Sequence, residues 1–223
     1  MKKSVLILLV AIFIGQSSFS QGLSESVKKK FTIGADFYSD IWSGVPANVD
    51  TRTINQGASV FGMLNFPLGE GMTSFSIGLG IRNHNMYSNS RIDDVKADTI
   101  NFSPIPDSVI YRRSKMNLVY LDLPVEFKLR FKNGIKVTVG FKAGWLIDSK
   151  EKYYGDDYDA RIGRKVKSKK IRNLENFSYG PTFRIGYKFI SLYSYYQISD
   201  AFTRNLGPEL RPFSVGLTLT ACK

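Results

Sequence analysis

The chain has 223 residues, a formal net charge of +12 and one cysteine, Cys222. A single cysteine excludes an intramolecular disulfide and a cysteine metal cluster, and the length suits one large all-β domain or a small barrel. The basic balance fits either nucleic acid or an anionic membrane surface as a partner.

The N-terminal segment distinguishes these two partners. Met1, Lys2 and Lys3 form a basic start, residues 5–14 are an apolar run too short to span a bilayer comfortably, and Ser18 and Ser20 are small residues before a cleavage point. This pattern predicts that residues 1–20 are a cleaved signal peptide and that residues 21–223 form the mature domain. Because an exported protein does not meet the chromosome, we expect no nucleic-acid partner.

Eight segments of the mature chain are predicted to be β-strands, because apolar and polar residues alternate in them with a period of two; the faces of the second are ambiguous, and tyrosines blur the alternation of the seventh. They cover residues 30–42, 54–66, 73–87, 117–131, 135–152, 176–189, 192–202 and 211–221. No run of 18 or more apolar residues follows the N-terminal segment, so the sequence predicts no helical membrane span.

Residues 117–147 form the most regular of these hairpins. Leu121, Val125 and Phe127 share one face of the first strand, Val139 and Phe141 share one face of the second, and an Asn-Gly pair supplies the tight turn between them. Each strand is long enough to cross a membrane, which takes about 9 to 11 residues.

Short and long connections alternate along the chain. Short turns fall near Gly69, Asn133 and Ser191, and the other connections are longer and more polar. Short turns at one end and long loops at the other are typical of outer-membrane barrels. We therefore expect an all-β fold, an eight-stranded antiparallel up-and-down transmembrane β-barrel, with both termini and the short turns in the periplasm.

The polar face of the strands is predicted to fill the barrel, because an eight-stranded barrel is just wide enough for side chains. Buried charges need partners, so acids and bases are expected to alternate in a lumen ion-pair network. The residues assigned to this network are Asp36, Arg82, Asp122, Glu126, Lys128, Lys142, Arg184 and Lys188. Tyrosines and tryptophans near strand ends are candidates for the interfacial girdles: Tyr38, Trp42, Tyr87, Trp145, Tyr153, Tyr187 and Tyr196.

The segment 161–172 is the most basic of the predicted loops. We interpret it as an anion-binding loop for the phosphates of lipopolysaccharide or for an acidic partner; the alternative is a solvated loop whose charges balance the acidic residues before it. Its basic residues are Arg161, Arg164, Lys165, Lys167, Lys169, Lys170 and Arg172.

Three other functions compete with a structural role. His84, the only histidine, is predicted at the inward face near the rim, and a lipid-modifying barrel enzyme would use it with Ser88, Ser90 or Asp93. A small passive channel is a second alternative. A soluble lipocalin-like ligand-binding barrel, with the apolar face inward, is a third. No catalytic residue, metal site or cofactor is assigned.

Residues 120–128, YLDLPVEFK, resemble a Y-L-[DE]-[IL]-P strand of the PorT-like outer-membrane β-barrel proteins of Gram-negative bacteria. Residues 180–187, GPTFRIGY, and 211–217, RPFSVGL, are similar to the closing strands of that family. The resemblance implies an eight-stranded barrel in the outer membrane, without agreed catalytic residues, and a role in protein secretion for some members.

The sequence therefore predicts a non-enzymatic integral outer-membrane protein. Its role is expected to be structural, adhesive or accessory to secretion, through its extracellular loops. The expected partners are outer-membrane lipid, lipopolysaccharide, and envelope or secretion proteins.

Overall fold

The computed structural model describes residues 30–69, 72–156 and 163–221, the side chain of Arg164 excepted. The predicted signal peptide lies outside these residues. The strands are β1 (Phe31–Ser43), β2 (Gln56–Leu68), β3 (Thr73–Tyr87), β4 (Ser90–Ile92), β5 (Phe102–Pro104), β6 (Tyr111–Arg130), β7 (Ile135–Asp156), β8 (Gly163–Lys169), β9 (Phe177–Tyr187), β10 (Ile190–Tyr196) and β11 (Arg211–Ala221).

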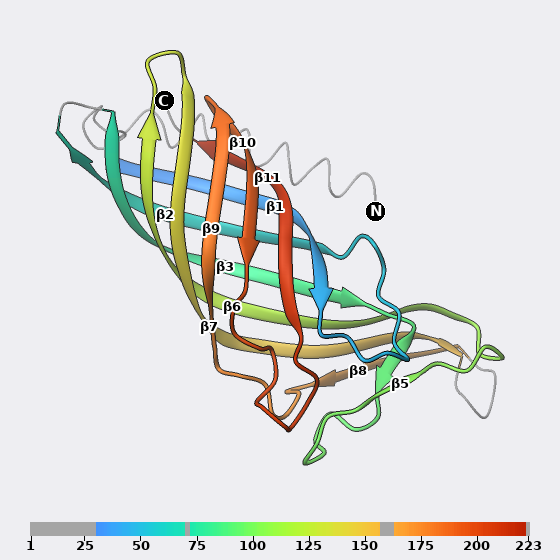
Figure 1. The fold of residues 1–223 in the computed structure, drawn as a ribbon. Helices are drawn as coiled ribbons and strands as arrows, with labels where there is room; N and C mark the ends of the chain where they lie inside the picture. The colour runs from blue at the N-terminus through green and yellow to red at the C-terminus, as the bar shows by residue number, and fades with distance from the viewer. Residues whose placement is uncertain (1–29, 70–71, 157–162, 222–223) are drawn as a thin grey trace.

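Eight of these strands close into an antiparallel barrel (Figure 1). Its neighbours run in the order β6-β3-β2-β1-β11-β10-β9-β7, and pairing of β6 with β7 completes the ring. Strand β1 pairs along its length with the last strand, β11. The predicted eight-stranded up-and-down barrel is thus confirmed, with β8 added outside the ring on β7.

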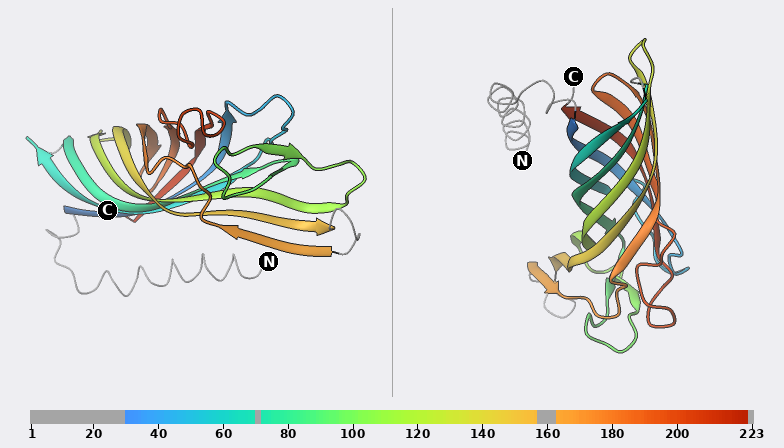
Figure 2. Two further views of the ribbon diagram at one scale, coloured as in Figure 1. Left: turned by 90° about the horizontal axis from the view of Figure 1, so that it is seen from below. Right: turned by 90° about the vertical axis from the view of Figure 1, so that its left-hand side faces the viewer.

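The connections are short at one end of the barrel, here called the turn end, and long at the other, the loop end (Figure 2). The turn between β6 and β7 shows why the chain reverses so tightly. Gly134 has φ +88°, which favours glycine, and the Asn133 side chain accepts a hydrogen bond from the Ile135 backbone N–H at 3.1 Å.

Alternation places apolar side chains on the outside of the barrel. Phe37, Val60, Leu121, Phe141 and Leu217 lie on five different strands and are all exposed. Soluble monomers rarely expose a continuous apolar surface of this kind, whereas a lipid-facing band is what transmembrane barrels require. None of the helices in the described residues is long and apolar enough to cross a membrane.

A β-bulge interrupts the predicted alternation of β7. Val119 pairs with Asp148 and Tyr120 with Leu146, so Ile147 has no partner on β6. One extra residue moves all the following side chains to the opposite face. Beyond the bulge, Ser149 and Glu151 point inward and are buried. The prediction of one uninterrupted alternating strand over residues 135–152 was therefore wrong beyond the bulge.

The connections at the loop end pack together instead of extending freely. Ile92, Ile100, Phe102, Phe202 and Leu210 form one buried cluster with inward residues of the barrel strands. Backbone bonds join the connections: the Ile100 N–H donates to the Leu206 carbonyl at 2.9 Å. We call this cluster the loop cap. The longest of the connections that the sequence analysis expected, between the predicted strands 73–87 and 117–131, is not a plain loop, because it contains β4, β5 and the start of β6.

Candidate functional site

The polar interior of the barrel is the first candidate site. Arg184 on β9 lies at its centre, where its Nη2 is 3.1 Å from Oδ2 of Asp36 and its Nη1 contacts Glu126. Thr218 accepts a hydrogen bond from Nε of Arg184 and donates one to Asp36 at 2.6 Å. Lys128 lies 3.6 Å from the second oxygen of Glu126. Four strands thus contribute to one ion-pair group.

A second group lies nearer the loop end. Nε of Arg82 is 3.1 Å from Asp122, and Nζ of Lys142 is 3.7 Å from the same carboxylate. The guanidinium of Arg82 also stacks over the rings of Tyr120 and Tyr195, at 4.8 and 4.5 Å from their centroids. Such cation–π contacts compensate a buried guanidinium for the hydration that it loses.

The structure places seven of the eight residues assigned to the lumen network inside the barrel, in ion pairs. The eighth, Lys188, is exposed at the turn between β9 and β10, and its assignment to the lumen was wrong. The alternation of β9 ends at Tyr187, and Lys188 turns the chain with φ 49°. Two cavities beside Arg184 have volumes of only about 10 and 40 Å³, so side chains fill the lumen.

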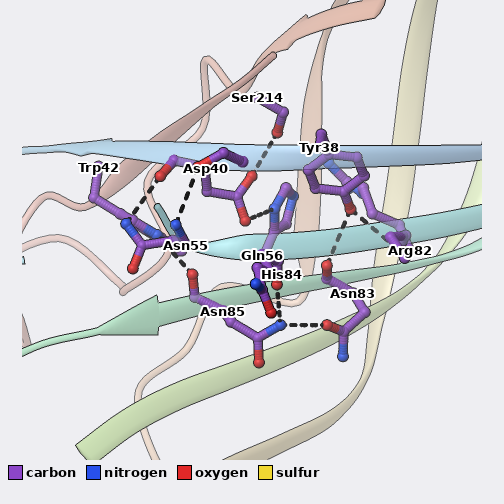
Figure 3. A network of polar contacts seen from close by, with 12 residues as sticks. Tyr38, Asp40, Trp42, Asn55, Gln56, Arg82, Asn83, His84, Asn85 and Ser214 are labelled. Carbon is purple, nitrogen blue, oxygen red and sulfur yellow. Dashed lines mark hydrogen bonds and ion pairs between the residues drawn. The ribbon is translucent and has the colours of Figure 1, made fainter. Parts of the chain in front are cut away.

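His84 lies in a closed polar and aromatic box (Figure 3). Its Nδ1 is 2.9 Å from Oδ2 of Asp40, whose other oxygen accepts a hydrogen bond from Ser214 at 2.7 Å. The rings of Tyr38 and Trp42 lie 5.7 and 6.2 Å from the imidazole. Tyr38, Trp42 and Tyr153 are therefore interior residues, which corrects their assignment to an interfacial girdle.

A catalytic triad requires a nucleophile within hydrogen-bond reach of the base. Within the described residues, Nε2 of His84 has no hydrogen-bond partner. The hydroxyls of Ser88 and Ser90 lie 3.0 Å from each other, and Asp93 is exposed. The structure does not bring these residues together around His84. Nor do the described residues contain a group of three His, Cys, Asp or Glu side chains that could hold a metal ion.

The basic segment 161–172 contains a strand and is not a loop as predicted. β8 pairs with the extension of β7, with Lys167 opposite Lys152 and Lys165 opposite Tyr154. Arg172 turns away and pairs with Asp98 at 2.6 Å. Lys169 and Lys170 are exposed. Arg161 and the side chain of Arg164 lie outside the described part of the chain.

The outward face of the β6–β7–β8 sheet is strongly basic. We call it the basic face; its residues are Arg113, Lys115, Lys150, Lys152, Lys165, Lys167 and Lys169. The sequence analysis singled out only the β8 members. Alternating cations at 113 and 115 and at 150 and 152 were the signal that could have found the others, but the bulge at Ile147 concealed which face they share.

Beside the basic face, a pocket of about 570 Å³ opens to the outside. Arg52, Tyr87, Arg113, Lys152 and Lys167 are among the residues that line it. Its described lining includes no aspartate or glutamate. An anionic ligand suits such a lining.

Lys115 and Glu151 are among the groups on these strands whose pKa departs from its ordinary value. Partial burial, with Arg113 nearby, lowers the pKa of Lys115 to about 8. Lys115 also donates to the Asn85 side chain at 2.6 Å. On the inward side of β7, burial raises the pKa of Glu151, although Oε1 accepts a hydrogen bond from the Ile92 N–H at 2.9 Å. A bound anion would return Lys115 toward its ordinary pKa.

Comparison with known proteins agrees with this architecture. A search of curated proteins found no match. The model of the outer membrane protein beta-barrel domain family matches residues 19–220, which include all eight barrel strands. The chain therefore belongs to the outer membrane protein beta-barrel domain family.

Proposed function

We propose that the chain is a non-enzymatic integral outer-membrane protein of the PorT-like type in Gram-negative bacteria. It acts through the surface of its loop end, in a structural, adhesive or secretion-accessory role. The observation that carries this proposal is a barrel whose lumen is filled by side chains and whose loop end is covered by packed connections. Ion pairs around Arg184 and Arg82 occupy the lumen, and the loop cap packs over one end.

A filled lumen argues against conduction. Moving an ion through it would require the buried pairs of Arg184 and Arg82 to separate, and separating buried charges is costly. In planar bilayers we expect the refolded protein to leave the baseline current unchanged. Discrete conductance steps that persist in Lys188→Met, a control at the turn end, would contradict the proposal and favour a passive channel.

The box around His84 argues against lipid modification. The imidazole is 1% exposed and is enclosed by Tyr38, Trp42 and Tyr120. A lipid substrate cannot reach it without opening the barrel. Mass spectrometry of lipid A from cells that express the wild type and His84→Asn should give identical species; a species lost only in the variant would favour the enzyme.

The proposal places the loop end outside the cell and both termini in the periplasm. Long external loops and short periplasmic turns are the rule in outer-membrane barrels. The test uses a Cys222→Ser background with Lys96→Cys at the loop end or Lys132→Cys at the turn end. Both lysines are exposed. A membrane-impermeant maleimide on intact cells should label only the first; labelling of the second alone would reverse the orientation.

Insertion itself is tested by fractionation and by heat-modifiable migration on a gel. We expect recovery with outer membranes and a mobility shift on boiling. Recovery in the soluble periplasm would refute the proposal.

A further inference from the structure

The basic face begins where the apolar belt ends. Ile81 on β3 pairs with Leu121 on β6, which pairs with Trp145 on β7, and these three outward side chains lie at one level. Trp145 packs against Phe177 with ring centroids 5.0 Å apart. Tryptophan at the edge of an apolar belt marks the membrane–water interface.

Two rows of basic side chains cross the sheet farther toward the loop end, beyond Val119 and the pair of Asn117 with Lys150. Lys115, Lys152 and Lys167 are cross-strand partners in one row. Arg113 and Lys165 flank Tyr154 in the next. Side chains opposite each other on antiparallel strands lie about 5 Å apart at Cβ, and like charges in that arrangement repel.

The described residues provide little negative charge against this repulsion. Lys150 pairs with Asp148, but no carboxylate of the described residues pairs with Arg113, Lys152 or Lys167. Burial lowers the pKa of Lys152, with Lys115 and Lys167 contributing repulsion. A bound anion would relieve the repulsion that the described residues leave uncompensated.

The pocket selects the kind of anion. Its volume of about 570 Å³ exceeds that of a simple inorganic anion, and apolar or aromatic side chains of Ile54, Tyr87 and Tyr154 line it together with the cations. Part of its lining comes from β6 and β7, and nearer the turn end the same two strands expose the apolar side chains of the belt. A headgroup that carries phosphates, attached to acyl chains lying along Trp145 and Leu121, satisfies both parts of this surface.

We propose that the basic face and its pocket bind the phosphorylated headgroup of a glycolipid in the surrounding leaflet. Lys115, Lys152 and Lys167 bind one phosphate, and Arg52 and Arg113 bind a second. The acyl chains lie against the apolar belt. This inference rests on the proposed membrane insertion and orientation, and it adds a defined ligand class to the loop end.

The test is lipid retention by the full mature chain in nanodiscs. Discs contain zwitterionic phosphatidylcholine with a small fraction of bisphosphorylated lipid A, monophosphorylated lipid A or phosphatidylglycerol. After transfer to mild detergent, native mass spectrometry counts the lipid that stays bound. The variant is Lys152→Gln/Lys167→Gln. The matched control is Lys96→Gln/Arg204→Gln, which removes the same charge from exposed loop-end residues outside the pocket lining.

We expect one bisphosphorylated lipid A per wild-type chain. Each basic residue near an anionic lipid surface changes the affinity about fivefold. The double variant, which lacks two of them, should therefore retain about tenfold to thirtyfold less lipid. The control should stay within about twofold. Monophosphorylated lipid A should bind more weakly, and phosphatidylglycerol should not be retained selectively.

Other outcomes would overturn the inference. Equal retention by the wild type and the double variant would exclude the basic face. Displacement of the lipid by micromolar inorganic pyrophosphate would assign the site to a soluble phosphate, and binding of poly-glutamate without lipid would assign it to an acidic protein. The same samples are checked for heat-modifiable migration: loss of the shift would count against the proposed membrane barrel, whereas a folded barrel without lipid would refute this inference alone.

Discussion

Replacement of Arg184 gives the most direct test of how the lumen is stabilised. Arg184→Met removes the only side chain that contacts both Asp36 and Glu126 among the described ion pairs. Both carboxylates are buried, at 0% and 2% exposure. Removing one partner from a buried ion pair costs about 3–5 kcal/mol, because the remaining charge is left without compensation. We expect a loss of this size in the free energy of unfolding.

The assay is equilibrium unfolding in guanidinium of the refolded barrel in micelles, followed by the fluorescence of Trp42 and Trp145. Arg184→Met/Asp36→Asn/Glu126→Gln removes the uncompensated charges and should recover most of the loss, since neutral replacement of a complete buried network is often tolerated. Lys188→Met, an exposed control, should change stability by no more than about 0.5 kcal/mol. A loss below about 1 kcal/mol in Arg184→Met would refute the reasoning.

Three further predictions concern other parts of the barrel. Gly180→Ala should reduce refolding yield severalfold, because a Cβ there would lie 1.8 Å from the backbone oxygen of Tyr196, the last residue of β10, whereas Gly163→Ala, with nothing within 4 Å, should refold normally; equal yields on gels would contradict this. Burial raises the pKa of Glu151, so its ionised form weakens the fold as pH rises through that value. Glu151→Gln, which can still accept the Ile92 hydrogen bond, should slow proteolysis of the loop cap at pH 8 and have little effect at pH 4. A larger effect at pH 4 than at pH 8 would contradict the predicted direction of the pH dependence. With a pKa of about 8, Lys115 loses its charge between pH 7 and 9; lipid retention should fall over this range in the wild type but stay flat in Lys115→Gln, and parallel curves would exclude Lys115.

The number and order of the barrel strands could be predicted because lipid imposes a simple rule on them. Every lipid-facing position must be apolar, so the period of two persists where a strand faces lipid, as in the run from Leu121 to Phe127. The same rule identified Asp36, Glu126 and Arg184 as inward residues, and the requirement for charge pairing predicted that they would meet.

The loop end could not be predicted to the same extent, because its residues do not all face the same environment and therefore show no regular alternation of apolar and polar residues. Ile100 and Phe202 are far apart in the sequence, and only the closed barrel brings them into one cluster. One bulged residue, Ile147, reversed the faces of the β7 extension, and no local signal marks it. Lys188 was misassigned for a related reason: the alternation of β9 was extended by one residue past Tyr187, where the strand ends and the chain turns.

The pairing of the first and last strands has a consequence for assembly. Inside this seam, Asp36 accepts a hydrogen bond from Thr218 and Asp40 accepts one from Ser214, at 2.6 and 2.7 Å. The two carboxylates on β1 therefore lack these donors until the final part of the chain has been delivered. A partly inserted chain would present an open edge and two poorly solvated acids to lipid, so the cost of an incomplete ring is concentrated at its last step. Insertion should accordingly be cooperative, with the ring closing only when β11 arrives.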